Sequence, residues 1–127
     1  MIDALFSQPN YAAMKKMLDA TALQQEAISS NLAHISQPGY KRLDVNASFA
    51  NELKRAVSSG SSEQILSLNP SLSVDTTAVS NTKDGNTVQL EKEMIKMNQN
   101  VIEHALETQL VTSQLMRLRL AITGRPT

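Results

Sequence analysis

The sequence predicts an all-α fold, in which two long helices at the two ends of the chain pair as a coiled coil. A long middle segment, irregular and partly extended or mobile, is expected to join them. Near both ends, apolar side chains recur every three or four residues. This is the spacing of a coiled-coil seam, the line of side chains that packs against a partner helix. The 127 residues are 41% hydrophobic but only 3% aromatic, which is poor for a globular core.

The first predicted element is an N-terminal core helix within residues 1–36. Ser7 followed by Pro9 is typical of a helix start, and Leu5 and Phe6 before it are expected to dock on another surface. Pro38 and Gly39 end the helix, because proline disfavours helix in the residue before it and glycine permits a positive φ. The predicted seam of this helix consists of Tyr11, Met14, Leu18, Thr21, Gln25, Ile28, Leu32 and Ile35.

The middle of the chain, residues 37–83, is predicted to be a turn followed by a serine-rich loop. A short helix is expected between Val45 and Val57, where Phe49, Leu53 and Val57 are four residues apart. From 58 to 83 serine and threonine recur, and the apolar residues among them are scattered. Such a polar segment cannot bury much surface by itself. We therefore expect a loop that is mobile or ordered only by contacts with other chains.

The C-terminal core helix is predicted within residues 84–127. Asn86 and Gln89 form a possible capping pair at its start, and Gly124 ends it. At about 1.5 Å per residue the helix would be roughly 55 Å long, too long to stand without a partner. We expect its seam to pair with the N-terminal one, so that the chain forms one structural domain. The seam consists of Leu90, Met94, Met97, Val101, His104, Thr108, Val111, Leu115, Leu118 and Ile122.

Composition argues against several classes of function. Twelve basic and twelve acidic residues balance, without the basic patch of a nucleic-acid partner. No apolar run is long enough for a membrane span, and the N-terminus lacks the pattern of a cleaved signal peptide. The two histidines have no metal-binding companions, since Glu103 and Glu107 are expected on the surface side of the C-terminal helix. We expect no enzyme, no catalytic residue, no cofactor and no metal.

Two motifs resemble a known family. Ile28-Ser29-Ser30-Asn31-Leu32-Ala33 followed by Pro38-Gly39-Tyr40-Lys41 resembles the N-terminal signature of bacterial flagellar rod, hook and hook-associated proteins, with His34 and Gln37 departing from it. The segment Asp84-Gly85-Asn86-Thr87-Val88 and the terminal Leu118-Arg119 resemble the proximal rod members of that family. The resemblance covers both termini, about two thirds of the chain.

The resemblance implies a structural subunit of the flagellar basal-body rod, on the periplasmic side. Such subunits self-assemble through their terminal helices into an axial tube that transmits torque and carries the export channel. They leave the cell through type III export without a cleaved signal peptide. The implied partners are other copies of the chain, other proximal rod subunits, and the membrane-ring adaptor and export-gate proteins at the rod base. The alternative is a soluble coiled-coil adaptor or export chaperone that binds a partner helix.

Subunit contacts are expected at the turn and along the C-terminal seam. Asn31 either caps its own helix or bonds a neighbour, and Tyr40 is expected at an exposed bend facing another subunit. Polar seam residues such as Thr21 and His104 weaken an isolated helix pair while fixing its register, so ordering and assembly are expected to be coupled. The candidate interface residues are Asn31, Leu32, Pro38, Gly39, Tyr40, Met94, Met97, His104, Val111, Leu115, Leu118 and Ile122.

Overall fold

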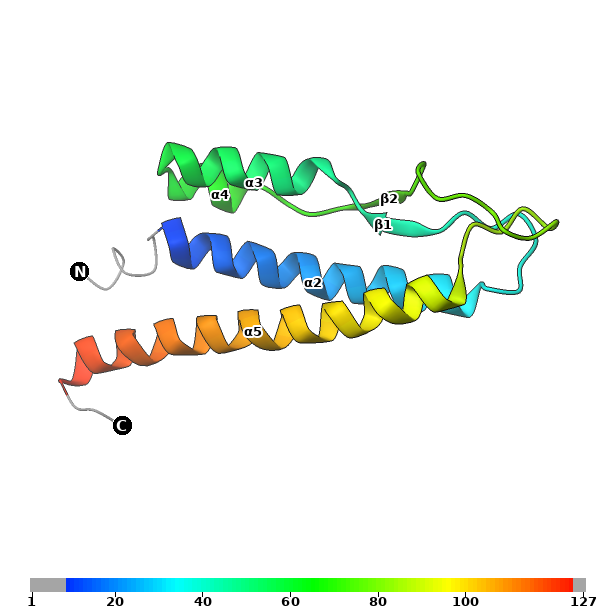
Figure 1. The fold of residues 1–127 in the computed structure, drawn as a ribbon. Coiled ribbons are helices and arrows are strands. Elements are labelled where there is room, and N and C mark those ends of the chain that lie inside the picture. The colour runs from blue at the N-terminus through cyan, green and yellow to red at the C-terminus, as the bar shows by residue number, and fades with distance from the viewer. Residues whose placement is uncertain (1–8, 125–127) are drawn as a thin grey trace.

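The computed structural model describes residues 9–124 as an elongated, mostly helical molecule (Figure 1). Helix α2 (Pro9–Ala33) lies in the middle, with the antiparallel helix α5 (Leu90–Thr123) along one side. Helices α3 (Ser48–Ser59) and α4 (Ser62–Ser67) lie along its other side. The prediction of two long terminal helices is confirmed. The predicted start at Ser7 and the docking of Leu5 and Phe6 lie outside the described residues.

The middle segment is more ordered than the sequence predicts, and the expectation of an all-α fold is wrong in one respect. Strands β1 (Leu43–Val45) and β2 (Leu72–Val74) form a two-stranded antiparallel sheet in which Leu43 pairs with Val74. The predicted short helix is present as α3, with Phe49 and Leu53 buried as expected. Ala56, rather than Val57, is its third buried residue.

Helix α4 corrects the prediction of a loop over 58–83. Gly60, with a φ of +71°, ends α3, and the Ser61 hydroxyl caps α4 by accepting a hydrogen bond from the backbone N–H of Gln64. These turns direct Ile65 into a small apolar core, where it is fully buried. Serine therefore serves here as a helix cap rather than as flexible linker. The core consists of Ala12, Phe49, Leu53, Ala56 and Ile65.

The start of α5 also differs from the prediction. Its N-cap is Gln89, which makes no capping hydrogen bond through its side chain, so the predicted Asn86–Gln89 capping pair is wrong. The Asn86 amide nitrogen instead donates to the backbone carbonyls of His34, Ile35 and Gln37, at 2.9, 3.1 and 2.8 Å. These carbonyls lie just past the C-terminus of α2. Asn86 therefore closes the end of the other long helix. The predicted end at Gly124 is confirmed, in a left-handed conformation.

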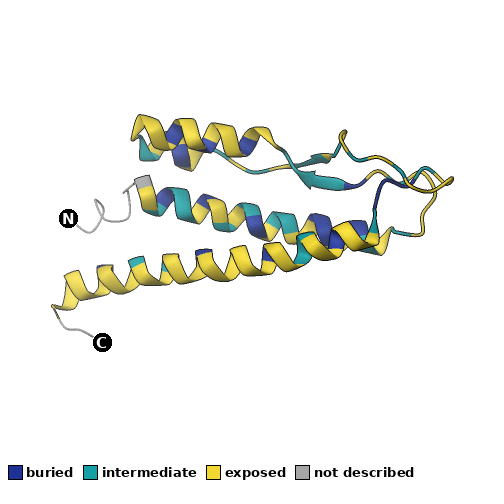
Figure 2. Cartoon of the chain, viewed as in Figure 1, coloured by how far each residue is buried: buried dark blue, intermediate teal, exposed yellow. Residues whose placement is uncertain are grey.

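The most buried residues of α5 coincide with the predicted seam only at Leu118. These residues are Glu93, Asn100, Glu107 and Leu118, whereas most of the helix surface is exposed (Figure 2). The first three are separated by seven residues, and each directly precedes a predicted seam position. The face of α5 that packs against the rest of the chain therefore consists mostly of polar side chains. The expectation that Glu107 lies on the surface side is wrong, while Glu103 is exposed as expected.

No described helix has the length and apolar character that crossing a membrane requires.

Candidate assembly interface

A buried arginine connects the strands to the start of α5. Arg42 donates from Nε to Glu93 Oε1 at 2.6 Å, and from Nη1 to Asp44 Oδ2 and Asp75 Oδ2 at 3.1 and 2.5 Å. Glu93 is only 1% exposed, so its charge depends on this pairing. We call Arg42, Asp44, Asp75 and Glu93 the arginine joint. It joins segments that are far apart in the sequence.

Charge in the arginine joint is fixed by these contacts. Burial by itself would lower the pKa of Arg42, but its hydrogen bonds to Glu93, Asp44 and Asp75 outweigh burial and raise the pKa above its ordinary value. The Thr77 hydroxyl, aided by Arg42, lowers the pKa of Asp75. Arg42 and Asp75 therefore stay ionised at neutral pH. The contribution of Asp75 to stability is lost in acid, as the pH falls through its lowered pKa.

Asn31 attaches the last turns of α2 to strand β1. Its amide makes two hydrogen bonds to the backbone of Leu43. The Nδ2 atom donates to the Leu43 carbonyl at 2.9 Å, and Oδ1 accepts from the Leu43 N–H at 2.8 Å. The Nδ2 atom also lies 3.4 Å from Glu93 Oε2. Asn31 is fully buried. It therefore neither caps its own helix nor reaches outward in this chain, and instead holds a strand in place.

Tyr40 likewise turns inward. Its hydroxyl donates to Asn31 Oδ1 at 3.3 Å and lies 3.1 Å from the Ser30 hydroxyl oxygen. Its ring stacks on that of His34, with centroids 4.7 Å apart. The side chain is half-buried rather than presented on an exposed bend.

The two motifs of the family resemblance meet at the end of the molecule. The Gly39 N–H donates to the Asp84 carbonyl at 2.8 Å, and the Thr87 N–H donates to the Tyr40 carbonyl at 3.0 Å. Gly39 has a φ of +74°, as its sequence predicts, and Gly85 has a φ of +78°. A Cβ on Gly85 would lie 3.8 Å from the Gly39 Cα. A Cβ at that distance would be in ordinary contact, so the positive φ angles, and not a close approach of the turns, favour glycine at these positions.

Polar side chains fill the middle of the α2–α5 contact. The Thr21 hydroxyl donates to Glu107 Oε2 at 2.8 Å, and His104 Nδ1 lies 3.4 Å from the same hydroxyl oxygen. Asn100 Nδ2 donates to the Thr21 carbonyl at 3.0 Å. Burial raises the pKa of Glu107, although the bond from Thr21 opposes this effect. Hydrogen bonds therefore set the register of this contact.

The outer surface of α5 is unusually apolar. Eleven large apolar side chains on this helix are at least 43% exposed. They lie on several sides of the helix, because residues separated by one, two or five positions cannot share one face. A helix that is apolar around most of its circumference is normally buried. These side chains are Leu90, Met94, Ile95, Val101, Ile102, Leu106, Leu110, Leu115, Met116, Leu120 and Ile122.

The predicted interface residues fall into three groups. Asn31 and Leu118 are buried within the chain, and Leu32, Tyr40, Met97 and Val111 are half-buried. The remaining candidates are exposed and available to a neighbour: Pro38, Gly39, Met94, His104, Leu115 and Ile122.

Sequence reasoning missed the arginine joint and the polar face of α5. The signal for the latter is present, since Glu93, Asn100, Glu107 and Gln114 repeat every seven residues. A polar heptad line beside an apolar one indicates that the helix makes different contacts on two of its faces. Within residues 9–124, no three His, Cys, Asp or Glu side chains are placed to hold a metal ion.

Comparison with known proteins finds a similar rod protein. The chain is 27% identical to the flagellar basal body rod protein FlgB of Salmonella typhimurium (strain LT2), over 126 aligned positions that cover 87% of this chain and 90% of the relative. No family model matches the chain. The similarity extends beyond the two terminal motifs and supports a flagellar proximal rod protein. The chain is therefore similar, over most of its length, to a flagellar basal body rod protein.

Proposed function

We propose that this chain is a structural subunit of the proximal rod of a bacterial flagellum, of the B type, and that it self-assembles through α2 and α5. The observation that carries the proposal is the apolar surface of α5. In the described chain α2 covers one side of α5 and leaves apolar residues exposed on several others. Several neighbouring subunits are needed to cover such a helix, as in a tube of packed subunits.

The arginine joint supports the same proposal from the other end of the molecule. It fixes the angle and register at which α5 leaves the strands, so the apolar surface of α5 is presented in one orientation. Torque transmission requires such a rigid subunit. We propose the remaining features with it: type III export without a cleaved signal, a place on the periplasmic side of the basal body, and contacts with other rod subunits and with the ring and gate proteins at the rod base.

The test is whether the chain is part of the basal body. A strain that lacks the gene is complemented with a tagged copy, and basal bodies are purified and probed for the tag. We expect the tag in the rod fraction and restored motility. A stable oligomer that stays in the cytosol and never enters basal bodies would refute the proposal. That result would favour the coiled-coil adaptor or chaperone.

A further inference from the structure

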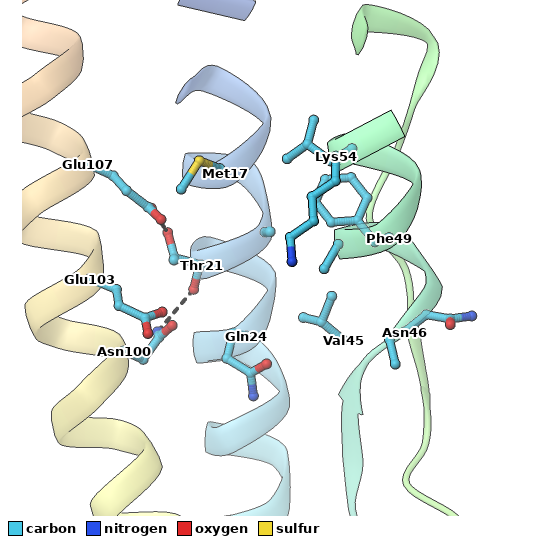
Figure 3. Close-up of a pocket in the computed structure, with 14 residues that line it drawn as sticks. Met17, Thr21, Gln24, Val45, Asn46, Phe49, Lys54, Asn100, Glu103 and Glu107 are labelled. Carbon is cyan, nitrogen blue, oxygen red and sulfur yellow. Dashed lines mark hydrogen bonds between the residues drawn. The ribbon is translucent and has the colours of Figure 1, made fainter. Parts of the chain in front are cut away.

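An open apolar groove runs beside α2, with α3 on one side and α5 on the other (Figure 3). Its volume is about 430 Å³. Met17 and Ala20 of α2 and Phe49, Ala50 and Leu53 of α3 supply its apolar lining. Met17 is 42% exposed. The groove thus offers apolar surface that the described chain leaves uncovered.

The α5 side of the groove carries acceptors without cationic partners. Glu103 and Glu107 line it, and no salt bridge within residues 9–124 involves either carboxylate. Asn100 also lines it and is only 4% exposed, yet its Oδ1 has no hydrogen-bond partner among the described residues. The cation of the lining, Lys54, comes from α3 on the other side of α2. Two carboxylates that form no salt bridge with a described residue favour a partner that carries positive charge.

The part of α5 from Leu106 onward carries a complementary surface. Leu106, Leu110, Arg117 and Leu120 are separated by four, seven and three residues, so they share one face of the helix. The three leucines are exposed, and Arg117 forms no salt bridge with a described residue. No acidic residue follows Glu107 on this helix. We call these four residues the arginine face.

We propose that the groove of one copy of this chain receives the arginine face of a second copy, with Arg117 of that copy pairing with Glu103, the exposed carboxylate of the groove. The proposal rests on the proposed function and specifies which surfaces meet. The same chain cannot supply this arginine, because Arg117 lies roughly 15 Å further along the same rigid helix than Glu107. The contact is heterologous, since the groove and the arginine face are different surfaces. Repetition of such a contact builds a ring or an open helical array rather than a closed dimer.

Variants that reverse the charge of Arg117 or Glu103 test whether these two residues pair between copies. In the purified full chain, Arg117→Glu and Glu103→Arg are each expected to weaken self-association at least tenfold, measured by sedimentation, because each places like charges together. An equimolar mixture of the two variants, and the double variant in one chain, should both recover association. Arg119→Glu is the matched control, since Arg119 lies on nearly the opposite side of the helix. Equal losses for Arg117→Glu and Arg119→Glu, or no recovery in the mixture, would overturn the pairing.

Cross-linking identifies the occupant directly. The chain has no cysteine, so single introduced cysteines report unambiguous contacts. Mixed Ala50→Cys and Leu110→Cys copies should form a disulfide-linked heterodimer on oxidation in assembled basal bodies. Ala50→Cys homodimers alone would indicate a symmetric contact and contradict the proposal. So would a bond within one chain between cysteines at positions 50 and 6, which would assign the groove to the chain's own N-terminal segment.

The two proposals fail in different ways. If unmodified chain is absent from basal bodies, the rod function fails. If the chain enters basal bodies and Arg117→Glu enters them as well as Arg119→Glu does, the rod function stands and the groove contact fails. Loss of incorporation with Arg117→Glu alone, restored by adding Glu103→Arg, supports both.

Discussion

The two parts of α5 differ in the buried contacts that they make within the chain. From Leu90 to Glu107, the side chains of Glu93, Asn100 and Glu107 are buried and hydrogen-bonded to α2 or to Arg42 beside β1. From Thr108 to Thr123 only Leu118 is buried, while exposed apolar side chains occur along both parts of the helix (Figure 2). Polar contacts thus set register inside the chain, while apolar surface is left free for contacts outside it. One helix can belong partly to its own subunit and partly to its neighbours.

The largest loss of stability is expected for a change in the arginine joint, where the first part of α5 is attached to the rest of the chain. Arg42→Ala leaves Glu93 buried without its counter-ion, which should lower the free energy of unfolding by about 3–5 kcal/mol. Urea unfolding followed by circular dichroism measures the change. Lys96→Ala is the control, because Lys96 is 42% exposed and lies 3.6 Å from Asp44, so its loss should cost under about 1 kcal/mol.

A further variant separates charge from packing. If Arg42→Ala fails to fold, the double change Arg42→Met with Glu93→Met removes both charges and should recover folded chain. A double variant that is no more stable than Arg42→Ala would show that the two side chains do not act as a pair.

Asn31→Ala should have the next largest effect. It leaves the backbone N–H and carbonyl of Leu43 without their partner, which should cost about 2–4 kcal/mol. Hydrogen exchange should locate the loss at β1. Asn98→Ala, at an exposed position on α5, should change stability little. Similar losses for the two variants would show that the Asn31 contact is not what attaches the strand.

Two leucines sharpen the comparison within the second half itself. Leu118 is 9% exposed and Leu115 is 43% exposed. Leu118→Ala should lower the free energy of unfolding by about 2–3 kcal/mol, whereas Leu115→Ala should lower it by less than about 1 kcal/mol. Basal-body incorporation should nevertheless fall for Leu115→Ala. If both variants fold and assemble like the unmodified chain, the second half of α5 is not an assembly surface.

The smallest effect concerns pH. Burial raises the pKa of Glu107 in the folded chain above its unfolded value. The folded state therefore binds this proton more tightly, and the contribution of Glu107 to stability falls as pH rises through the folded pKa. Glu107→Gln should remove this dependence, so the unmodified chain should gain stability relative to the variant on acidification from neutral pH. Urea unfolding of both chains from pH 4 to 8 measures it. A difference that is constant with pH would refute the assignment.

The sequence predicts the elements better than their faces. Periodicity reveals both long helices, and Pro38, Gly39 and Gly124 mark turns and ends, because these signals are local. The buried face of α5 is predicted correctly only in part, at Leu118, because apolar periodicity identifies an apolar surface without saying what covers it. Glu107 and Asn100 face α2 through hydrogen bonds to Thr21, which no spacing rule reports. The contacts of Arg42 span from 2 to 51 residues, so its joint is invisible to any short window of sequence.

The arginine joint has a consequence for the order in which the chain folds. Arg42 and Glu93 are 51 residues apart, and Asn31 and Glu93 are 62 residues apart. Contacts of such high contact order form late, because a long loop must close before they contribute. If the chain is exported through a narrow channel, as proposed, most of the polypeptide has to emerge before the joint can close, whichever end comes first. The joint therefore delays the final structure until most of the chain is available.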